Sequence, residues 1–316
     1  MAADTGALSL ADVRAAADRI APYVLKTPTL SGESVAGPGV WLKAENLQRT
    51  GSFKLRGALA RALALDAGGP GLTTGSAGNH AAALAWAARA LGLSCEVFMP
   101  TSAPIAKAEA AAALEAVVRL GGESVDECVA VARERAAETG MTFVHPFDDP
   151  LVVAGQGGVG LELVEDVPDL ARVVVPLGGG GLIAGMAVAI KAQRPKLRII
   201  GVEPEGAPVV SESLAAGQPV APSRLDSIAD GLGAPYTRPF NLGLVQRYVD
   251  QMRTVSDAAI IEAVKAITQQ AKLVVEPAGA AAVAALLADA EIERPVAAVL
   301  SGGNVDMDRL ASWLSR

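Results

Sequence analysis

One lysine in this chain has neighbours that suit covalent chemistry. Lys54 lies in the run TGSFKLRGA at residues 50–58, between a glycine-serine turn and the start of an expected helix. A run of four glycines at 178–181 and a Ser-Gly-Gly-Asn run at 301–304 follow much later. A lysine amine can form a Schiff base, and a glycine-rich loop can hold a phosphate. A serine followed by glycines offers a hydroxyl donor next to backbone that no side chain covers. These are the parts needed to hold pyridoxal phosphate.

The surroundings of Lys54 are apolar on one side and glycine-rich on the other. Burial there favours the neutral amine that Schiff-base chemistry needs. The plainer alternative is a solvated surface lysine at a helix start, where a positive charge is electrostatically unfavourable.

The glycine run follows an apolar segment and precedes an expected helix. Backbone amides of Gly178, Gly179, Gly180 and Gly181 face no side chains, and the helix N-terminus behind them favours a phosphate. A tight turn that merely needs glycine is the plainer alternative. A nicotinamide enzyme is another, because residues 179–184 read G-x-G-x-x-A and an acidic residue follows about 20 positions later. That fingerprint alone is weak, and it leaves Lys54 and the Ser301 loop unexplained.

Small polar residues also lie between an expected strand and helix at Ser76, Ala77, Gly78, Asn79 and His80. Hydroxyl and amide donors at a helix N-terminus can receive a carboxylate. An ordinary helix cap explains the same residues equally well. The histidine could be a satisfied core residue, and the Ser301 run another turn.

Composition excludes several classes of protein. The net charge is −7, aromatic residues make up 3%, and no basic tract is present, so nucleic-acid binding is disfavoured. No clean membrane span and no signal peptide are visible. Two cysteines and two histidines offer no metal-ligand spacing, so no metal site is expected. We expect a cytoplasmic protein without membrane or nucleic-acid partners.

Expected helices and strands alternate along the chain, which predicts an α/β fold with parallel sheets covered on both faces. Residues 71–147 hold their own alternating set. They are predicted to form a small domain inserted into a large one made of residues 1–70 and 148–316. Within the small domain, Pro104–Leu120 is expected to be one helix, followed by a helix over Val125–Thr139. Residues 215–249 are rich in proline and glycine and give no clear assignment.

Taken together, the motifs resemble the fold-type II pyridoxal-phosphate enzymes, and within them the serine/threonine dehydratase (threonine ammonia-lyase) and serine racemase family. The resemblance runs from about Leu10 to Trp313 and keeps the family's order of motifs. It rests on the segments at 42–58, 76–80, 146–157, 178–181, 276–280 and 301–304. It implies two α/β domains of the tryptophan synthase β-like kind, the cofactor pyridoxal 5'-phosphate and a homodimer.

The resemblance also implies roles for single residues. Lys54 would form the Schiff base and act as the base at the substrate's α-carbon. Phe53 would pack near the cofactor ring, Asn79 would bond its phenolic oxygen, and Ser301 would face its nitrogen. A hydroxyl at that nitrogen leaves the ring unprotonated, which favours prompt β-elimination over transamination. The remaining roles are phosphate binding by Gly178, Gly179, Gly180 and Gly181, and substrate binding by Ser76, Ala77, Gly78 and His80.

Two departures from the family pattern matter. Racemases of the family carry a second serine where this chain has Ala77, so inversion lacks its proton donor and dehydration is favoured. Their cation site also uses an acidic residue matching Glu203, a carbonyl near Ala207 and an aspartate where this chain has Val209. Losing one carboxylate puts a Mg²⁺ or Ca²⁺ site in doubt. The regulatory domain of long biosynthetic dehydratases is not expected after Arg316.

We therefore expect an ammonia-lyase that acts on threonine or serine and releases a 2-oxo acid. The open alternatives are a serine racemase, a β-replacing synthase of the same fold, and a non-catalytic protein that only binds the cofactor.

Overall fold

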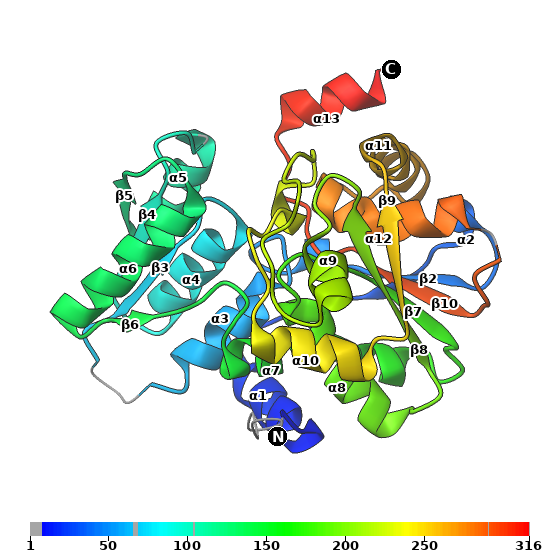
Figure 1. Ribbon diagram of the computed structural model, residues 1–316, viewed down its shortest axis with the longest axis horizontal. Helices are drawn as coiled ribbons and strands as arrows, with labels where there is room; N and C mark the ends of the chain where they lie inside the picture. The colour runs from blue at the N-terminus through cyan, green and yellow to red at the C-terminus, as the bar shows by residue number, and fades with distance from the viewer. Residues whose placement is uncertain (1–7, 66–68, 104, 290, 316) are drawn as a thin grey trace.

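The structure is a computed structural model that describes residues 8–65, 69–103, 105–289 and 291–315. Two sheets organise the chain, and Figure 1 shows them side by side, each with its own helices. The α/β fold expected from the alternating pattern is confirmed. The domain boundaries after residues 70 and 147 stay a prediction, and residues 1–7 and 66–68 lie outside the described residues.

The smaller sheet has four strands in the order β5-β4-β3-β6, and all its pairs are parallel. Its strands are β3 (Leu72–Gly75), β4 (Cys95–Met99), β5 (Val117–Leu120) and β6 (Thr142–Phe143). Its helices are α4 (Asn79–Ala90), α5 (Ile105–Ala112) and α6 (Val125–Thr139).

The expectation of one helix over Pro104–Leu120 is wrong. The helix α5 ends at Ala112, and the segment that follows is the edge strand β5. Between them the backbone of Glu115 takes a φ of 67°, a left-handed conformation that no continuous helix contains. Pro104 itself lies outside the described residues.

The larger sheet has six strands in the order β1-β2-β10-β7-β8-β9. All neighbours are parallel except β1, which runs antiparallel to β2 at one edge. The strands are β1 (Thr29–Ser31), β2 (Val40–Lys43), β7 (Arg172–Pro176), β8 (Arg198–Pro204), β9 (Gln251–Val255) and β10 (Val296–Val299).

Helices cover both faces of this sheet. They comprise α1 (Leu10–Ile20), α2 (Glu33–Ala36), α3 (Lys54–Ala62), α7 (Pro150–Asp166), α8 (Gly181–Gln193), α9 (Val209–Ala216), α10 (Pro239–Tyr248), α11 (Asp257–Ala266), α12 (Pro277–Ala288) and α13 (Met307–Leu314). Short turns are η1 (Glu45–Leu47), η2 (Asp230–Leu232) and the π-helical η3 (Ile267–Ala271). Among the described residues, no helix is long and apolar enough to cross a membrane.

The strand β7 shows why both faces need cover. Val173 and Val175 belong to the core that includes Ile183 of α8, whereas Val174 belongs to the core that includes Val283 of α12. Successive side chains of a strand point to opposite faces, so a strand that is apolar at every position must be buried on both sides. The sheet is thus fixed between two helical layers, with only its edges and strand ends available for a site.

Candidate active site

The chemical motifs all follow the carboxyl ends of parallel strands. Lys54 comes after β2, Ser301 directly after β10, and the glycine loop directly after β7, and these three strands are neighbours in the order β2-β10-β7. Ser76 follows β3 of the small sheet in the same way. Ligands of open α/β sheets bind outside such strand ends. Residues from both ends of the chain therefore meet at one place.

Lys54 begins helix α3 and lies against the segment that returns from the small sheet. Its Nζ donates a hydrogen bond to the carbonyl of Pro146 at 2.8 Å and lies 5.1 Å from the centroid of the Phe53 ring. Burial lowers the pKa of the amine to about 8, and the nearby carboxylate of Glu276 opposes that shift. The surroundings thus hold a larger share of neutral amine than an ordinary lysine has.

Backbone pairing fixes Ser301 beside the lysine segment. The amide of Phe53 donates to the carbonyl of Ser301 at 3.1 Å, and Ser52 and Gly302 form an isolated antiparallel bridge. The Ser301 side chain is 4% exposed, and its hydroxyl donates to the carbonyl of Ala278 at 3.4 Å. This long bond leaves the hydroxyl free to turn toward another acceptor.

The glycine loop leaves no room for side chains. A Cβ on Gly179 would lie 2.6 Å from the ring of Phe147, and a Cβ on Gly178 would lie 3.0 Å from the backbone of Leu232. Gly180 is the N-cap of α8 and has a φ of 95°, which favours glycine. The loop therefore presents bare backbone at a helix N-terminus, where amides and the helix dipole favour an anion.

The loop before α4 is also open. Gly78 is the N-cap of α4, its amide donates to the Ser76 hydroxyl at 3.3 Å, and a Cβ on Gly78 would meet no atom within 4 Å. Neither Ser76 nor Asn79 caps this helix with its side chain, so the ordinary-cap alternative is wrong. Ala77 lies between them with its methyl group half-buried.

The side chain of Asn79 joins the small lobe, built on the four-stranded sheet, to the large lobe, built on the six-stranded sheet. Its Nδ2 donates to Glu276 Oε1 at 2.6 Å, and its Oδ1 accepts from Asn304 Nδ2 at 2.8 Å. Burial raises the pKa of the Glu276 carboxyl to about 7, against the lowering effects of the Asn79 bond and of the Lys107 and Lys54 charges. A carboxyl that titrates near neutral pH thus lies close to the Lys54 amine.

Two histidines lie behind the lysine in neutral form. His80 is 2% exposed and its Nε2 lies 3.0 Å from the carbonyl of Val144, so it donates there. His145 Nδ1 accepts from the amides of Phe147 and Asp148 at 3.2 and 2.9 Å. Burial is the leading cause that lowers the pKa of each imidazole to about 3. His80 is therefore neutral, and its hydrogen bond to the carbonyl of Val144, just after β6, supports the loop before α4.

Comparisons with known proteins agree with this arrangement. The family described as "Pyridoxal-phosphate dependent enzyme" matches residues 20–302. The chain belongs to this family. It is 42% identical to the L-threonine ammonia-lyase of Thermotoga maritima over 87% of this chain and 70% of that protein. It is 38% identical to the serine racemase of Arabidopsis thaliana, covering 96% of this chain and 95% of the relative. The structure of maize serine racemase superposes with a TM-score of 0.92 at 36% identity, over 98% of this chain and 97% of that one.

The pyridoxal-phosphate dependent family settles the cofactor as pyridoxal 5'-phosphate and sets aside the nicotinamide alternative. The residues fit that group, because a half-buried lysine and a glycine loop in which every Cβ would be crowded lie after adjacent strands. The family and its fold-type II architecture, both expected from the motifs, are confirmed. Two activities occur among these relatives, so the family match alone leaves lyase and racemase open.

The position of the racemase cation site is filled differently in this chain. Both carboxylate oxygens of Glu203 accept bonds from the first turn of α9, from the amide of Val210 at 2.6 Å and from the amide and hydroxyl of Ser211. The carbonyl of Ala207 accepts the amide of Val209, whose side chain is fully buried. The carboxylate of Glu203 thus serves helix α9 in this structure, and the expected lack of a cation site stays a prediction.

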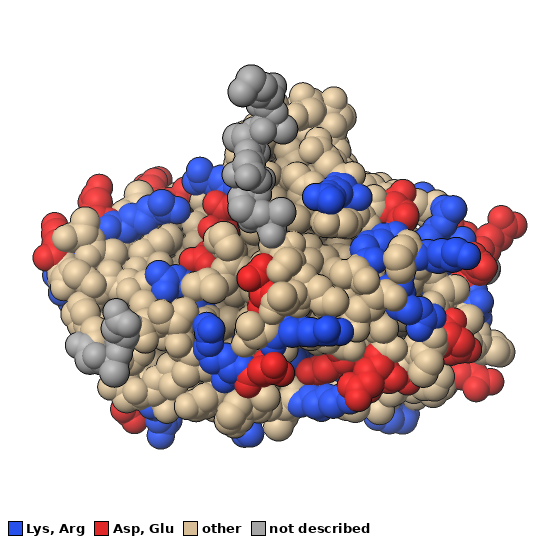
Figure 2. Space-filling view, turned by 90° about the horizontal axis from the view of Figure 1, so that it is seen from below, with Lys and Arg blue, Asp and Glu red and all other residues tan. Residues whose placement is uncertain are grey.

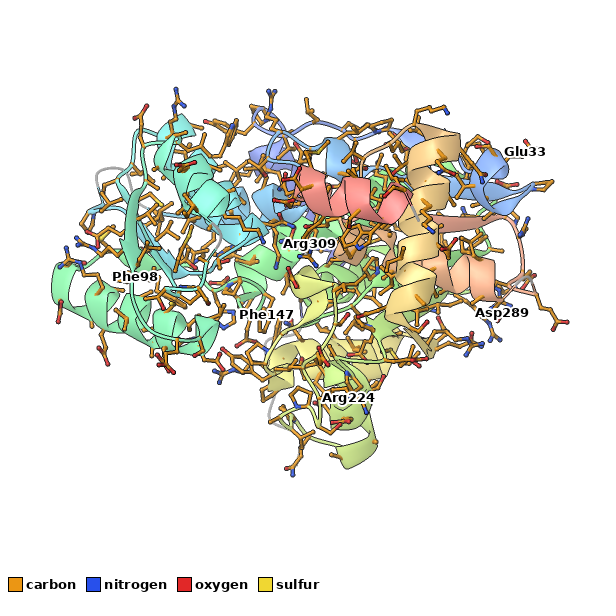
Figure 3. All side chains as sticks on the ribbon, turned by 90° about the horizontal axis from the view of Figure 1, so that it is seen from above. Glu33, Phe98, Phe147, Arg224, Asp289 and Arg309 are labelled. Atoms are coloured by element: carbon orange, nitrogen blue, oxygen red, sulfur yellow. The ribbon has the colours of Figure 1, made fainter. Side chains whose placement is uncertain are left out.

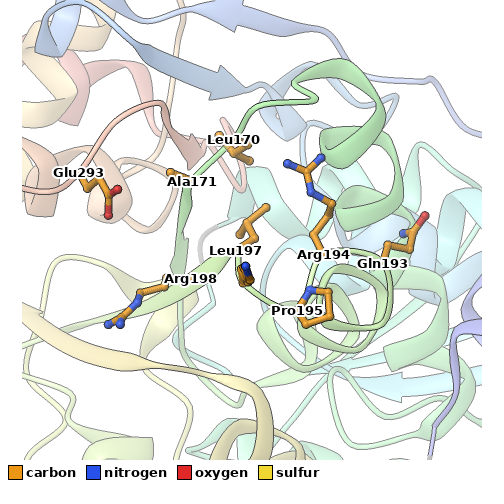
Figure 4. Close-up of a pocket in the computed structure, with 9 residues that line it drawn as sticks. Leu170, Ala171, Gln193, Arg194, Pro195, Leu197, Arg198 and Glu293 are labelled. Carbon is orange, nitrogen blue, oxygen red and sulfur yellow. The ribbon is translucent and has the colours of Figure 1, made fainter.

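One hollow on the surface is not part of this site. It measures about 530 Å³ and is lined by residues that precede β7 and β8, among them Ala171, Arg194 and Leu197 (Figure 4). These residues lie at the amino ends of the strands, at the sheet edge opposite the glycine loop. The hollow therefore does not belong to the cofactor site.

Three residues that matter to this geometry were given no role by the sequence. Pro146 offers a backbone carbonyl, which leaves no trace in residue type. Glu276 opens the segment 276–280 that carries part of the family resemblance, but the sequence alone indicated no role for its carboxylate. Asn241 lies in the stretch 215–249 that gave no assignment, and its contacts are formed only by the folded chain.

Proposed function

We propose that this protein is an ammonia-lyase that eliminates water from a small L-β-hydroxy amino acid, threonine or serine, and releases ammonia when water hydrolyses the resulting enamine. The product is the corresponding 2-oxo acid. The observation that carries the proposal is that the chain has a half-buried Lys54 amine with a lowered pKa and an alanine, Ala77, in the loop before α4. The first residue can take a proton from the α-carbon, and the second cannot return one to the opposite face.

Lys54 supports the role of base. Its pKa of about 8 leaves part of the amine neutral at physiological pH, and a neutral amine can both bind a carbonyl carbon and accept a proton. The hydrogen bond from Nζ to the Pro146 carbonyl holds the amine at the edge of the large sheet. The proton that Nζ accepts comes from the substrate's α-carbon.

The two loops would orient the reactants. Bound pyridoxal phosphate supplies an electron sink for the pair of electrons released at the α-carbon. The hydroxyl of Ser76 and the amides of Ala77 and Gly78 would hold the substrate carboxylate, because they lie at a helix N-terminus beside open space, whereas the amide of Ser76 donates to the carbonyl of Phe98. The Ser301 hydroxyl would donate a hydrogen bond to the unprotonated ring nitrogen, and the Asn79 amide would donate one to the ring's oxygen.

Serine racemase is the second candidate, and the names of the Arabidopsis and maize relatives favour it. Inversion needs an acid on the face of the α-carbon opposite the lysine. Ala77 offers a methyl group in the loop where racemases of the family place a serine. A homodimer, as is common in the family, remains part of the proposal.

The test is a screen of the purified protein for 2-oxo acid and ammonia release over L-serine, L-threonine and larger β-hydroxy amino acids. We expect pyruvate from serine and 2-oxobutanoate from threonine, and no release by Lys54→Ala. Borohydride reduction and peptide mapping should place the cofactor on Lys54. More D-serine than pyruvate from L-serine would instead identify a racemase, and a silent screen with a labelled Lys54 would favour the non-catalytic alternative.

A further inference from the structure

Two backbone carbonyls beside the glycine loop converge on one buried amide group. Asn241 lies in the first turn of α10 and is fully buried. Its Nδ2 donates to the carbonyl of Phe147 at 2.9 Å and to the carbonyl of Gly179 at 3.0 Å. The hydroxyl of Thr237 donates to the same Gly179 carbonyl at 3.3 Å.

The position of Asn241 requires two donors on one short side chain. An amide NH₂ carries two protons, whereas a hydroxyl carries one and a carboxylate none. The reversed amide would place Oδ1 against two carbonyl oxygens, so the acceptors fix its orientation. Oδ1 has no hydrogen-bond partner among the described residues, which is unfavourable for a buried acceptor. The two donated bonds are therefore what this residue contributes.

The two carbonyls belong to the segments that hold opposite ends of the cofactor. Phe147 directly follows Pro146, whose carbonyl accepts the Lys54 Nζ bond. Gly179 lies in the glycine loop, and the Phe147 ring lies so close to it that a Cβ on Gly179 would approach to 2.6 Å. Figure 3 shows Phe147 lying between the lobe that carries Phe98 and the larger lobe.

The Gly179 carbonyl also governs the direction of the next amide. In a trans peptide the C=O and the following N–H point in opposite directions. Holding the Gly179 carbonyl toward α10 therefore turns the amide of Gly180 away from α10. A loop whose carbonyl were free to rotate would present an oxygen to a phosphate for part of the time, which is repulsive.

We propose that Asn241 is a positioning residue that fixes the glycine loop relative to the Lys54 segment and so sets the affinity for the phosphate end of the cofactor. It acts through the carbonyls of Phe147 and Gly179 and does not touch the cofactor. The affinity for a cofactor that is held at both ends depends on the distance between the two segments that hold it. The affinity for a ligand that is held only at Lys54 does not depend on that distance.

The experiment compares pyridoxal phosphate with pyridoxal, which has the same aldehyde and no phosphate. Apoprotein is titrated with each, and the dissociation constants are read from absorbance of the Lys54 adduct. Asn241→Leu keeps the branched shape and the number of heavy atoms, with a somewhat larger volume, and removes both donors. We expect the pyridoxal phosphate constant to rise about tenfold or more, as two lost hydrogen bonds imply, and the pyridoxal constant to change less than about twofold.

Two further variants complete the design. Thr237→Val removes one bond to Gly179 and should raise the phosphate-dependent constant about threefold, which keeps the test available if Asn241→Leu fails to fold. Ser213→Ala removes a buried hydroxyl of α9 that donates to Val209 and should leave both constants unchanged. Equal rises for both ligands, or a lower melting temperature of the apoprotein with an unchanged ratio of constants, would overturn the proposal. A wild-type protein that fails to bind pyridoxal phosphate would instead contradict the cofactor assignment.

Discussion

At the scale of single residues, burial and one carboxylate act in opposite directions on the Lys54 amine. Burial lowers its pKa, and Glu276 raises it, with a result of about 8. Such an amine is roughly 10% neutral at pH 7, roughly 300-fold more than an ordinary lysine. The fold thus raises the neutral fraction of the proposed nucleophile before any cofactor or substrate binds.

The pH dependence of Lys54 acylation in the apoprotein tests this preparation. Only the neutral amine reacts, so labelling should rise with pH through a midpoint of about 8. Glu276→Gln removes the charge that raises the pKa, so its midpoint should move to lower pH. Mass spectrometry of the Lys54 peptide, with Nα-acetyl-lysine amide and its free ε-amine as the reference, gives both curves. A wild-type midpoint above about 10 would contradict the argument.

The second residue-scale prediction concerns Ala77, which offers no proton donor in the loop before α4. Ala77→Ser restores a hydroxyl there and should raise the ratio of D-serine to pyruvate formed from L-serine. The gain is expected to be small, because a new acid must also be oriented by its neighbours. Chiral chromatography of both products, with Ala77→Gly as the control without a hydroxyl, measures the ratio. An unchanged ratio in the serine variant would remove Ala77 as the determinant of reaction type.

At the scale of elements, the sequence predicted best where local signals were strong. Helix α6 has the expected bounds Val125–Thr139, with Ser124 as its N-cap and Gly140 as its left-handed C-cap. The short strands β1 and β9 were missed, because three to five half-exposed residues carry little pattern. The alanine-rich run before β5 extended the expected helix too far, and the break at Glu115 has no glycine to announce it.

The residues of the site likewise divide into those that the sequence revealed and those that it did not. The glycine loop and the lysine run could be recognised in the sequence because four consecutive glycines exceed what a tight turn needs, and because the lysine lies between a glycine-serine turn and a helix start. Asn241 could not be recognised from the sequence, because an asparagine in an irregular stretch is common. Its role depends on two carbonyls that only the folded chain brings to it. Glu276 likewise gains its raised pKa only from tertiary burial.

Helix α9 gives the element-scale prediction. A cap side chain normally serves the N2 and N3 amides of a helix, and here Glu203 at the end of β8 serves them instead. We expect treatment with EDTA to leave the melting temperature and the proposed lyase activity unchanged. Glu203→Ala should lower the free energy of unfolding by about 1–3 kcal/mol, because buried amides lose their acceptor. Activity lost with EDTA and restored by Mg²⁺ would show that a cation binds after all.

At the scale of the whole molecule, charge is mixed over the surface and concentrated in one buried network. Figure 2 shows acidic and basic side chains interspersed on the face seen from below. Inside, Arg56 pairs with Glu45 and Glu162 at 2.8 and 2.7 Å, and Lys43 pairs with Glu162 at 2.7 Å. Arg56, Lys43 and Glu45 are at most 1% exposed. The network joins β2, η1, α3 and α7, and thereby holds the helix that begins with Lys54.

Removing Arg56 should therefore cost far more than removing an arginine on the same helix near the surface. Arg56→Met leaves the carboxylate of Glu45 buried without its partner, and we expect a loss of about 3–5 kcal/mol in the free energy of unfolding. Arg61 pairs with Asp149 at 3.1 Å where both side chains are about one-fifth exposed, so Arg61→Met should cost under about 1 kcal/mol. Urea unfolding of the apoproteins measures both. Adding Glu45→Gln to Arg56→Met should recover part of the lost free energy of unfolding, because the uncompensated charge is then gone. A double variant less stable than Arg56→Met alone would show that the loss comes from packing rather than from charge.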